Sequence, residues 1–191
     1  MANVIDVANY ILEISREDSP GGDYDLISPL KLQKLIYFCQ GYFLALQGEP
    51  LFPDPIEAWE HGPVCPMLYH LFKSYGSAPL MATVDPGRLL LDKREKNIIN
   101  MVYQAYRQYS ASGLRNITHR EGPWVDTWEV AKNTVIKIEA MLEYFKALLD
   151  VPPQRIPLSS ESEKRELAEI LKKAEANGEI DLSRFCVPVG I

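Results

Sequence analysis

Apolar residues follow a helical period in two segments of the first fifty residues. Between residues 3 and 16 they recur at steps of three and four, which predicts an amphipathic helix; they are Val4, Val7, Ala8, Ile11 and Ile14. A second segment begins at Ser28-Pro29, a capping residue followed by a proline suited to the first helical position, and stops before Gly48. Its apolar residues cover almost the whole circumference, so we expect residues 29–47 to form a buried central helix.

Shorter elements are expected after this helix. Three closely spaced prolines precede residues 56–59, which are typical of a short strand, and Gly62-Pro63 indicates a turn. A helix is expected from Pro66 to Tyr75, ending at Gly76. Residues 80–84 are compatible with a second strand.

Helical patterns return in the next sixty residues. A capping-box sequence at residues 92–95 opens a helix, and a short helix is expected at 114–118. Pro123-Trp124 reads as a loop, and apolar residues at steps of three and four predict a last helix over 134–149. The pattern therefore predicts a mainly α fold, a compact multi-helix domain around helix 29–47 with a small β element near 55–60.

The segment Val151-Pro152-Pro153-Gln154 breaks the last helix and predicts a boundary. We expect a domain over residues 1–151 and a C-terminal extension over 152–191 that holds a charged amphipathic helix at about 160–177. The narrow apolar stripe of that helix provides candidates for partner binding: Leu167, Ile170, Leu171 and Ala174. Such a stripe either docks in a partner's groove or packs on its own domain, and the pattern leaves both open.

Charge and cysteine content exclude several classes of protein. Twenty Lys and Arg against 26 Asp and Glu give a net charge of −6, which argues against a general nucleic-acid binder. Three scattered cysteines without a CxxC pair argue against a disulfide framework or a zinc site and favour a reducing, cytoplasmic compartment. No signal peptide or membrane-spanning stretch is recognised. We expect no cofactor, metal, nucleic acid or membrane, and leave the oligomeric state open.

Candidate acid–base chemistry is limited to two places. His61 lies four residues before Cys65, but a Cys–His nucleophile pair needs an orienting third group that the sequence does not show. Thr118, His119 and Glu121 lie close together and can brace a loop, line a binding surface or line a catalytic pocket. We expect bracing and predict no catalytic residue, with a hydrolase built on either group as the less favoured alternative.

Other conspicuous side chains are expected to have ordinary structural roles. Trp59, Trp124 and Trp128 are predicted to anchor the core rather than an interface. Lys31 and Lys34 lie one helical turn apart, and we expect them to form a solvated strip on the central helix.

Three sequence blocks are more specific together than any single motif. The first runs from residue 30 to 42, the second joins residues 50–52 to 56–64, and the third spans 118–124. In this order and spacing they resemble the Panacea domain family, which includes SocA-like antitoxins and phage-associated GepA-like proteins. The resemblance covers roughly residues 3 to 150. Its motif positions, expected to define the fold and able to face a partner, are Lys31, Gln33, Lys34, Tyr37, Gln40, Gly41, Glu57, Trp59, Gly62, Pro63, Val64, Thr118, His119, Glu121, Pro123 and Trp124.

The resemblance implies an antitoxin of a bacterial or prophage toxin–antitoxin pair that neutralises its toxin by direct protein contact. It also implies alternatives, a proteolytic adaptor that delivers its target to a protease or a phage-associated regulator that binds a host protein. No cofactor, metal or catalytic residue comes with the family.

Overall fold

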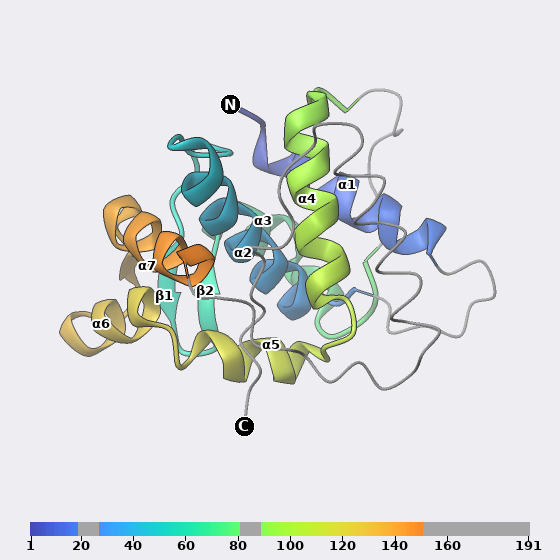
Figure 1. Ribbon diagram of the computed structural model, residues 1–191. Helices are drawn as coiled ribbons and strands as arrows, with labels where there is room; N and C mark the ends of the chain where they lie inside the picture. The colour runs from blue at the N-terminus through green and yellow to red at the C-terminus, as the bar shows by residue number, and fades with distance from the viewer. Residues whose placement is uncertain (19–26, 81–88, 151–191) are drawn as a thin grey trace, which may run out of the picture. The chain divides into compact units, whose positions relative to one another are not determined.

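The computed structural model describes residues 1–18, 27–80 and 89–150. The chain divides into two compact units, Met1–Phe145 and Lys146–Ile191. The described part is mainly α-helical with one small sheet (Figure 1), which confirms the predicted fold class. In chain order its elements are α1 (Val4–Glu17), α2 (Pro29–Gln47), β1 (Glu57–Trp59), β2 (Gly62–Val64), α3 (Pro66–Phe72), the 3₁₀ helix η1 (Lys73–Tyr75), α4 (Lys93–Tyr106), α5 (Ala111–Thr118), α6 (Gly122–Val130), β3 (Thr134–Val135) and α7 (Ile138–Asp150).

Helix α2 is the centre of the first unit, with the bounds that its sequence pattern predicts. The Ser28 hydroxyl accepts a hydrogen bond from the Lys31 N–H at its start, and Gly48 ends it in the left-handed conformation with φ of 74°. Residues 31–44 of this helix are all buried. Helices α4 and α5 and strand β2 of the hairpin all pack against α2 (Figure 1). Helix α1 packs against α4.

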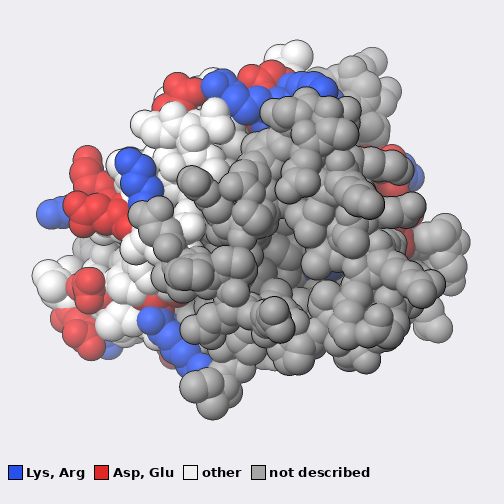
Figure 2. Space-filling view, viewed as in Figure 1, with Lys and Arg blue, Asp and Glu red and all other residues white. Residues whose placement is uncertain are grey.

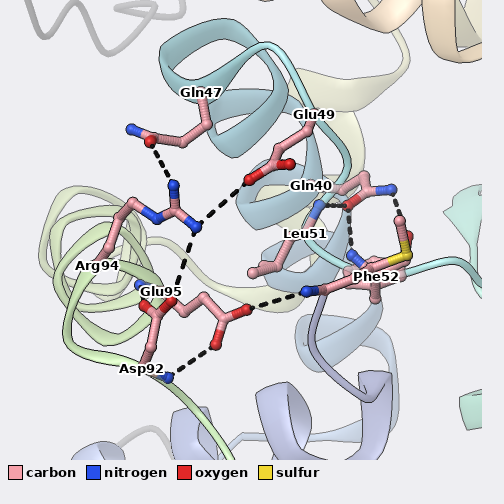
Figure 3. Close-up of polar contacts among 9 residues, drawn as sticks. Gln40, Gln47, Glu49, Leu51, Phe52, Asp92, Arg94 and Glu95 are labelled. Atoms are coloured by element: carbon pink, nitrogen blue, oxygen red, sulfur yellow. Dashed lines mark hydrogen bonds and ion pairs between the residues drawn. The ribbon is translucent and has the colours of Figure 1, made fainter.

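A buried glutamine fixes the segment that leaves α2. Gln40 donates from Nε2 to the Phe52 carbonyl at 3.0 Å, and its Oε1 accepts the N–H of Leu51 at 2.9 Å (Figure 3). The same picture shows Arg94, at the start of α4, reaching the Gln47 amide and the Glu49 carboxylate near the end of α2. Helix α4 and the segment after α2 are thereby held at the same end of the central helix.

Replacing Gln40 by leucine is expected to lower the free energy of unfolding by about 2 kcal/mol, because buried backbone groups of Leu51 and Phe52 would lose their partner. Urea denaturation of the purified protein measures this loss. The control is Gln47→Leu, which removes a partly exposed contact to Arg94 of 3.4 Å and should change stability by less than about 0.5 kcal/mol. Equal effects of the two substitutions would contradict the role given to Gln40.

The sheet has the strand order β2-β1-β3 and is antiparallel throughout. Strands β1 and β2 form a hairpin in which Ala58 lies opposite Pro63 and Trp59 lies opposite Gly62. The expectation of a turn at Gly62-Pro63 is therefore wrong, since both residues are in β2 and the connection is made two positions earlier, by residues 60 and 61. Gly62 supplies the positive φ of 96° that follows this connection.

Two further expectations in the C-terminal half are corrected. Pro123-Trp124 is not a loop but belongs to the first turn of α6. Proline suits this position because an N–H in the first turn has no acceptor within the helix. The helix expected from residue 134 begins at Ile138, because Thr134–Val135 pairs with β1 as β3. The strand considered at 80–84 falls almost wholly outside the described residues, as does the extension with Leu167, Ile170, Leu171 and Ala174. None of the described helices is long and apolar enough to cross a bilayer.

Candidate functional site

The outer edge of β2 is closed by two neighbouring side chains of α2. The Gln33 amide accepts the Cys65 N–H at 2.8 Å and donates to the Cys65 carbonyl at 3.3 Å. Lys34 donates from Nζ to the Pro63 carbonyl at 2.8 Å. Pro63 has no N–H to satisfy. Side chains of the central helix thus occupy the positions that another strand would take.

The lysines of α2 do not form the solvated strip that was expected. Lys31 is 3% exposed and Lys34 is 0% exposed. The Lys31 ammonium donates to the Arg107 carbonyl at the C-terminal end of α4, where a cation is favourable. Burial, reinforced by the charge of Arg115, lowers the pKa of Lys34 to about 7. Both lysines therefore act as internal donors to backbone carbonyls.

Gly62 lies where these groups leave no room for a side chain. A Cβ there would lie 2.7 Å from the Thr118 hydroxyl oxygen and 2.9 Å from Nζ of Lys34. The Thr118 hydroxyl donates to the Arg115 carbonyl one turn earlier in α5. Residues from all three sequence blocks therefore meet here: Lys34 from the first, Gly62 from the second and Thr118 from the third.

The third block ties α6 to the hairpin through tryptophan. Trp124 donates from its indole N–H to the Trp59 carbonyl at 3.0 Å. Its ring stacks on His119 with centroids 4.0 Å apart and on Trp128 with centroids 5.5 Å apart. The Lys132 ammonium lies 5.0 Å from the Trp128 ring centre. Of the three tryptophans only Trp124 is buried, while Trp59 and Trp128 are half-buried.

Glu121 is the least satisfied side chain of the motif. It precedes α6, is buried, and neither carboxyl oxygen has a hydrogen-bond partner in the part of the chain that the structure describes. Burial raises its pKa to about 8, although the nearby Tyr37 hydroxyl opposes the rise. Burial raises the pKa of Tyr106 and of Tyr144, and the Glu121 charge adds to both rises. At neutral pH this carboxyl is therefore mainly protonated inside a cluster of tyrosines.

These groups are poorly placed for acid–base chemistry on an external substrate. The His119 Nε2 is buried without a partner, and burial followed by the Arg115 charge lowers its pKa. His61 is exposed whereas Cys65 is buried. Burial raises the pKa of the Cys65 thiol, which is the reverse of what a nucleophilic cysteine needs. Within the described residues no three metal-binding side chains come together.

The remaining motif positions lie in the same helices and in the hairpin. Glu57 accepts the Trp59 indole N–H at 2.8 Å, and Gly41 lies against the ring of Phe145. Val64 lies within β2 and Pro123 in the first turn of α6. Their importance for the fold stays a prediction that substitutions test.

Two contributors were not found by sequence reasoning. Arg115 and Phe145 lie outside the recognised blocks, yet Arg115 lies near the Lys34 and His119 charges and Phe145 fills the space over Gly41. The sequence carries one signal for the buried contacts of α2, although not for Arg115 or Phe145. Gln33 and Lys34 are polar residues in a helix that is apolar around its circumference. Polar residues at buried helical positions indicate donors to another element.

Comparison with known proteins identifies the segment that carries this arrangement. Residues 32–125 match the model of the Antitoxin SocA-like, Panacea domain family. This segment therefore resembles a Panacea domain. Over 112 residues the chain is 36% identical to Antitoxin SocA from Caulobacter vibrioides (strain NA1000 / CB15N). The aligned stretch covers 51% of this chain and 58% of that protein. The chain thus spans less than two thirds of its relative. No solved structure matches the chain.

The Panacea match includes all three groups of motif residues that surround β2. It contains Gln33 and Lys34 of α2, the hairpin itself, and the segment from Thr118 to Trp124. The match ends at residue 125, before Trp128, β3 and α7.

Proposed function

We propose that this protein is an antitoxin that neutralises a partner toxin by direct protein–protein binding. The observation that carries the proposal is that the polar side chains of the Panacea motif turn inward. Gln33, Lys34 and Gln40 bind backbone groups, and Glu121 is buried. A motif whose polar groups are covered supports a rigid scaffold for binding better than it supports turnover of a substrate.

The surface charge is compatible with a protein partner. The chain carries a net charge of −6, and on the visible described surface basic side chains are interspersed with acidic ones (Figure 2). Among the described residues visible there, this mixture gives no support for a phosphate-binding face. An acidic antitoxin would associate faster with a basic toxin through electrostatic steering. We propose that this binding takes place in the cytoplasm.

A growth assay tests the antitoxin role. The open reading frame adjacent to this gene is expressed alone and then together with this protein. We expect arrest that co-expression relieves, and a complex that survives co-purification. Glu121→Gln is expected to neutralise as well as the wild type, because no catalytic role is assigned to that residue. Arrest without relief, or relief without a complex, would contradict neutralisation by binding.

The C-terminal extension is proposed as a second binding element for the toxin. Its candidate residues are Leu167, Ile170, Leu171 and Ala174. Deletion of residues 154–191 is expected to weaken toxin binding by tenfold or more, measured by calorimetry, while the melting temperature stays within a few degrees of that of the full chain. Unchanged toxin binding would contradict this role and favour packing of the stripe on its own domain.

A further inference from the structure

A half-buried tryptophan of the hairpin and an exposed tyrosine of α3 form an aromatic pair next to two glutamates of the hairpin. The rings of Trp59 and Tyr69 meet edge to face with centroids 4.8 Å apart. The Glu57 carboxylate accepts the Trp59 indole N–H at 2.8 Å, and the exposed Glu60 follows Trp59 directly in the connection between the strands. We name these four residues the hairpin patch. Tyr69 is 42% exposed and comes from α3, so the patch joins two elements.

The side chain of Trp59 is not required to hold α6 in place. The bond from Trp124 goes to the Trp59 carbonyl, which any residue would supply. Ala58, the residue before Trp59 in β1, is fully buried, so its neighbours Glu57 and Trp59 point to the opposite face of the strand. Val135 pairs with Glu57 across β1 and β3 and is 53% exposed. This face of the sheet is therefore partly open to solvent along β1 and β3, whereas Val64 of β2, which lies opposite Glu57, is buried.

Half-exposed tryptophan and tyrosine are the residue types that dominate binding energy at protein interfaces. Their ring faces attract cationic side chains, and arginine makes such contacts more often than lysine. Carboxylates beside the rings add charge-assisted hydrogen bonds to a guanidinium group. The hairpin patch combines both features on a chain with a net charge of −6. Its chemistry therefore complements a basic protein surface.

Resting on the proposed function, we propose that the hairpin patch is the docking surface for the toxin and receives an arginine-bearing segment of it. The guanidinium group stacks on the rings of Trp59 and Tyr69 and pairs with the carboxylates of Glu57 and Glu60. The buried motif beneath then has a defined task, because Lys34, Gln33 and Trp124 hold the hairpin that presents the patch.

Calorimetry with the purified toxin of the adjacent gene tests the assignment. Tyr69→Ala and Glu60→Lys are each expected to weaken binding by about tenfold or more. The matched controls are Tyr75→Ala, which removes a tyrosine of similar exposure (39%) from η1, and Glu139→Lys, which reverses an exposed charge on α7. Both controls should leave the dissociation constant within twofold. The effect of Glu60→Lys should shrink at high salt, since the pairing is electrostatic.

The outcomes separate this inference from the function on which it rests. If the wild-type protein binds the toxin and both patch variants bind equally well, the docking surface lies elsewhere and the antitoxin role stands. If the controls weaken binding as much as the patch variants, the assignment to the hairpin is also overturned. If the wild-type protein binds no toxin at all, the proposed function fails together with the inference. Both patch variants change exposed side chains, so their thermal unfolding should match that of the wild type.

Discussion

Replacing Gly41 by alanine is expected to lower the free energy of unfolding by about 3 kcal/mol, the upper end of the usual cost of overpacking a core. The new Cβ would lie 2.1 Å from Cε2 of Phe145. That ring cannot retreat easily, because it is fully buried and packs edge-on against Tyr37 and Tyr42, with centroids 5.5 and 4.9 Å away. In an exposed helix the same substitution would stabilise by up to about 1 kcal/mol. Packing against α7 therefore reverses the sign of an ordinary helix preference.

Urea denaturation of both proteins measures the effect of Gly41→Ala. The control is Gly122→Ala in α6, whose Cβ would meet its nearest neighbour at an ordinary 3.6 Å and should cost less than about 0.5 kcal/mol. The double variant with Phe145→Leu should lose less stability than the sum of the single losses, because the smaller side chain relieves the clash. A loss below 1 kcal/mol for Gly41→Ala would contradict the close packing of α2 and α7.

Replacing Glu121 by glutamine is expected to stabilise the protein at pH 7 by up to about 3 kcal/mol. The pKa of this carboxyl rises from 4.5 to about 8 on folding. Below pH 4.5 the group is protonated in both states and costs nothing. As the pH rises from 4.5 to 8 the unfolded state alone ionises, so stability falls by about 1.4 kcal/mol per pH unit. The glutamine of the Glu121→Gln variant cannot ionise, so the stability of that variant does not fall over this pH range for this reason.

Lys34 adds the opposite dependence at higher pH. Its pKa falls from 10.5 to about 7 on folding, so the unfolded state binds an extra proton between these values and stability rises with pH there. Between pH 7 and 8 the two slopes cancel. The combined contribution of the two groups is therefore least favourable near pH 7 to 8.

Chemical denaturation from pH 4 to 10 measures both contributions. The Glu121→Gln curve should coincide with the wild-type curve near pH 4 and lie above it at pH 7. Lys34→Met should remove the rise between pH 8 and 10. Parallel curves for Glu121→Gln and wild type across the whole range would show that Glu121 ionises with an ordinary pKa and is not held protonated in the fold.

The parts of the fold that depend on local signals could be predicted from the sequence. Ser28-Pro29 and Gly48 bound α2 as expected, and the capping box at residues 92–95 opens α4. The short strand near residue 57 was also predicted in its correct place. Each of these depends on residues within one or two turns of chain, where capping and periodicity act directly.

The parts that depend on distant contacts could not be predicted. The burial of Lys34 requires a carbonyl 29 residues away, and Lys31 requires one 76 residues away. Without these acceptors a lysine is best placed in solvent, which is why a solvated strip was expected. Pro63 was likewise assigned to a turn. A strand accepts proline only where the backbone N–H is not needed for pairing, as at the outer edge of β2, and the sequence does not show which strand is at an edge. The motif positions stay a prediction from the sequence, and the contacts that each makes could not be predicted from it.

The closed outer edge of β2 also limits how copies of this chain can aggregate. Fibres grow when each added molecule pairs one sheet edge and offers a second free edge to the next. Here the Gln33 amide and the Lys34 ammonium occupy the outward backbone groups of Cys65 and Pro63, so strand addition is confined to the two-residue β3. A sheet that can be extended on one side only can pair with a second copy and then stop, so backbone pairing through this sheet ends at a dimer rather than a fibre.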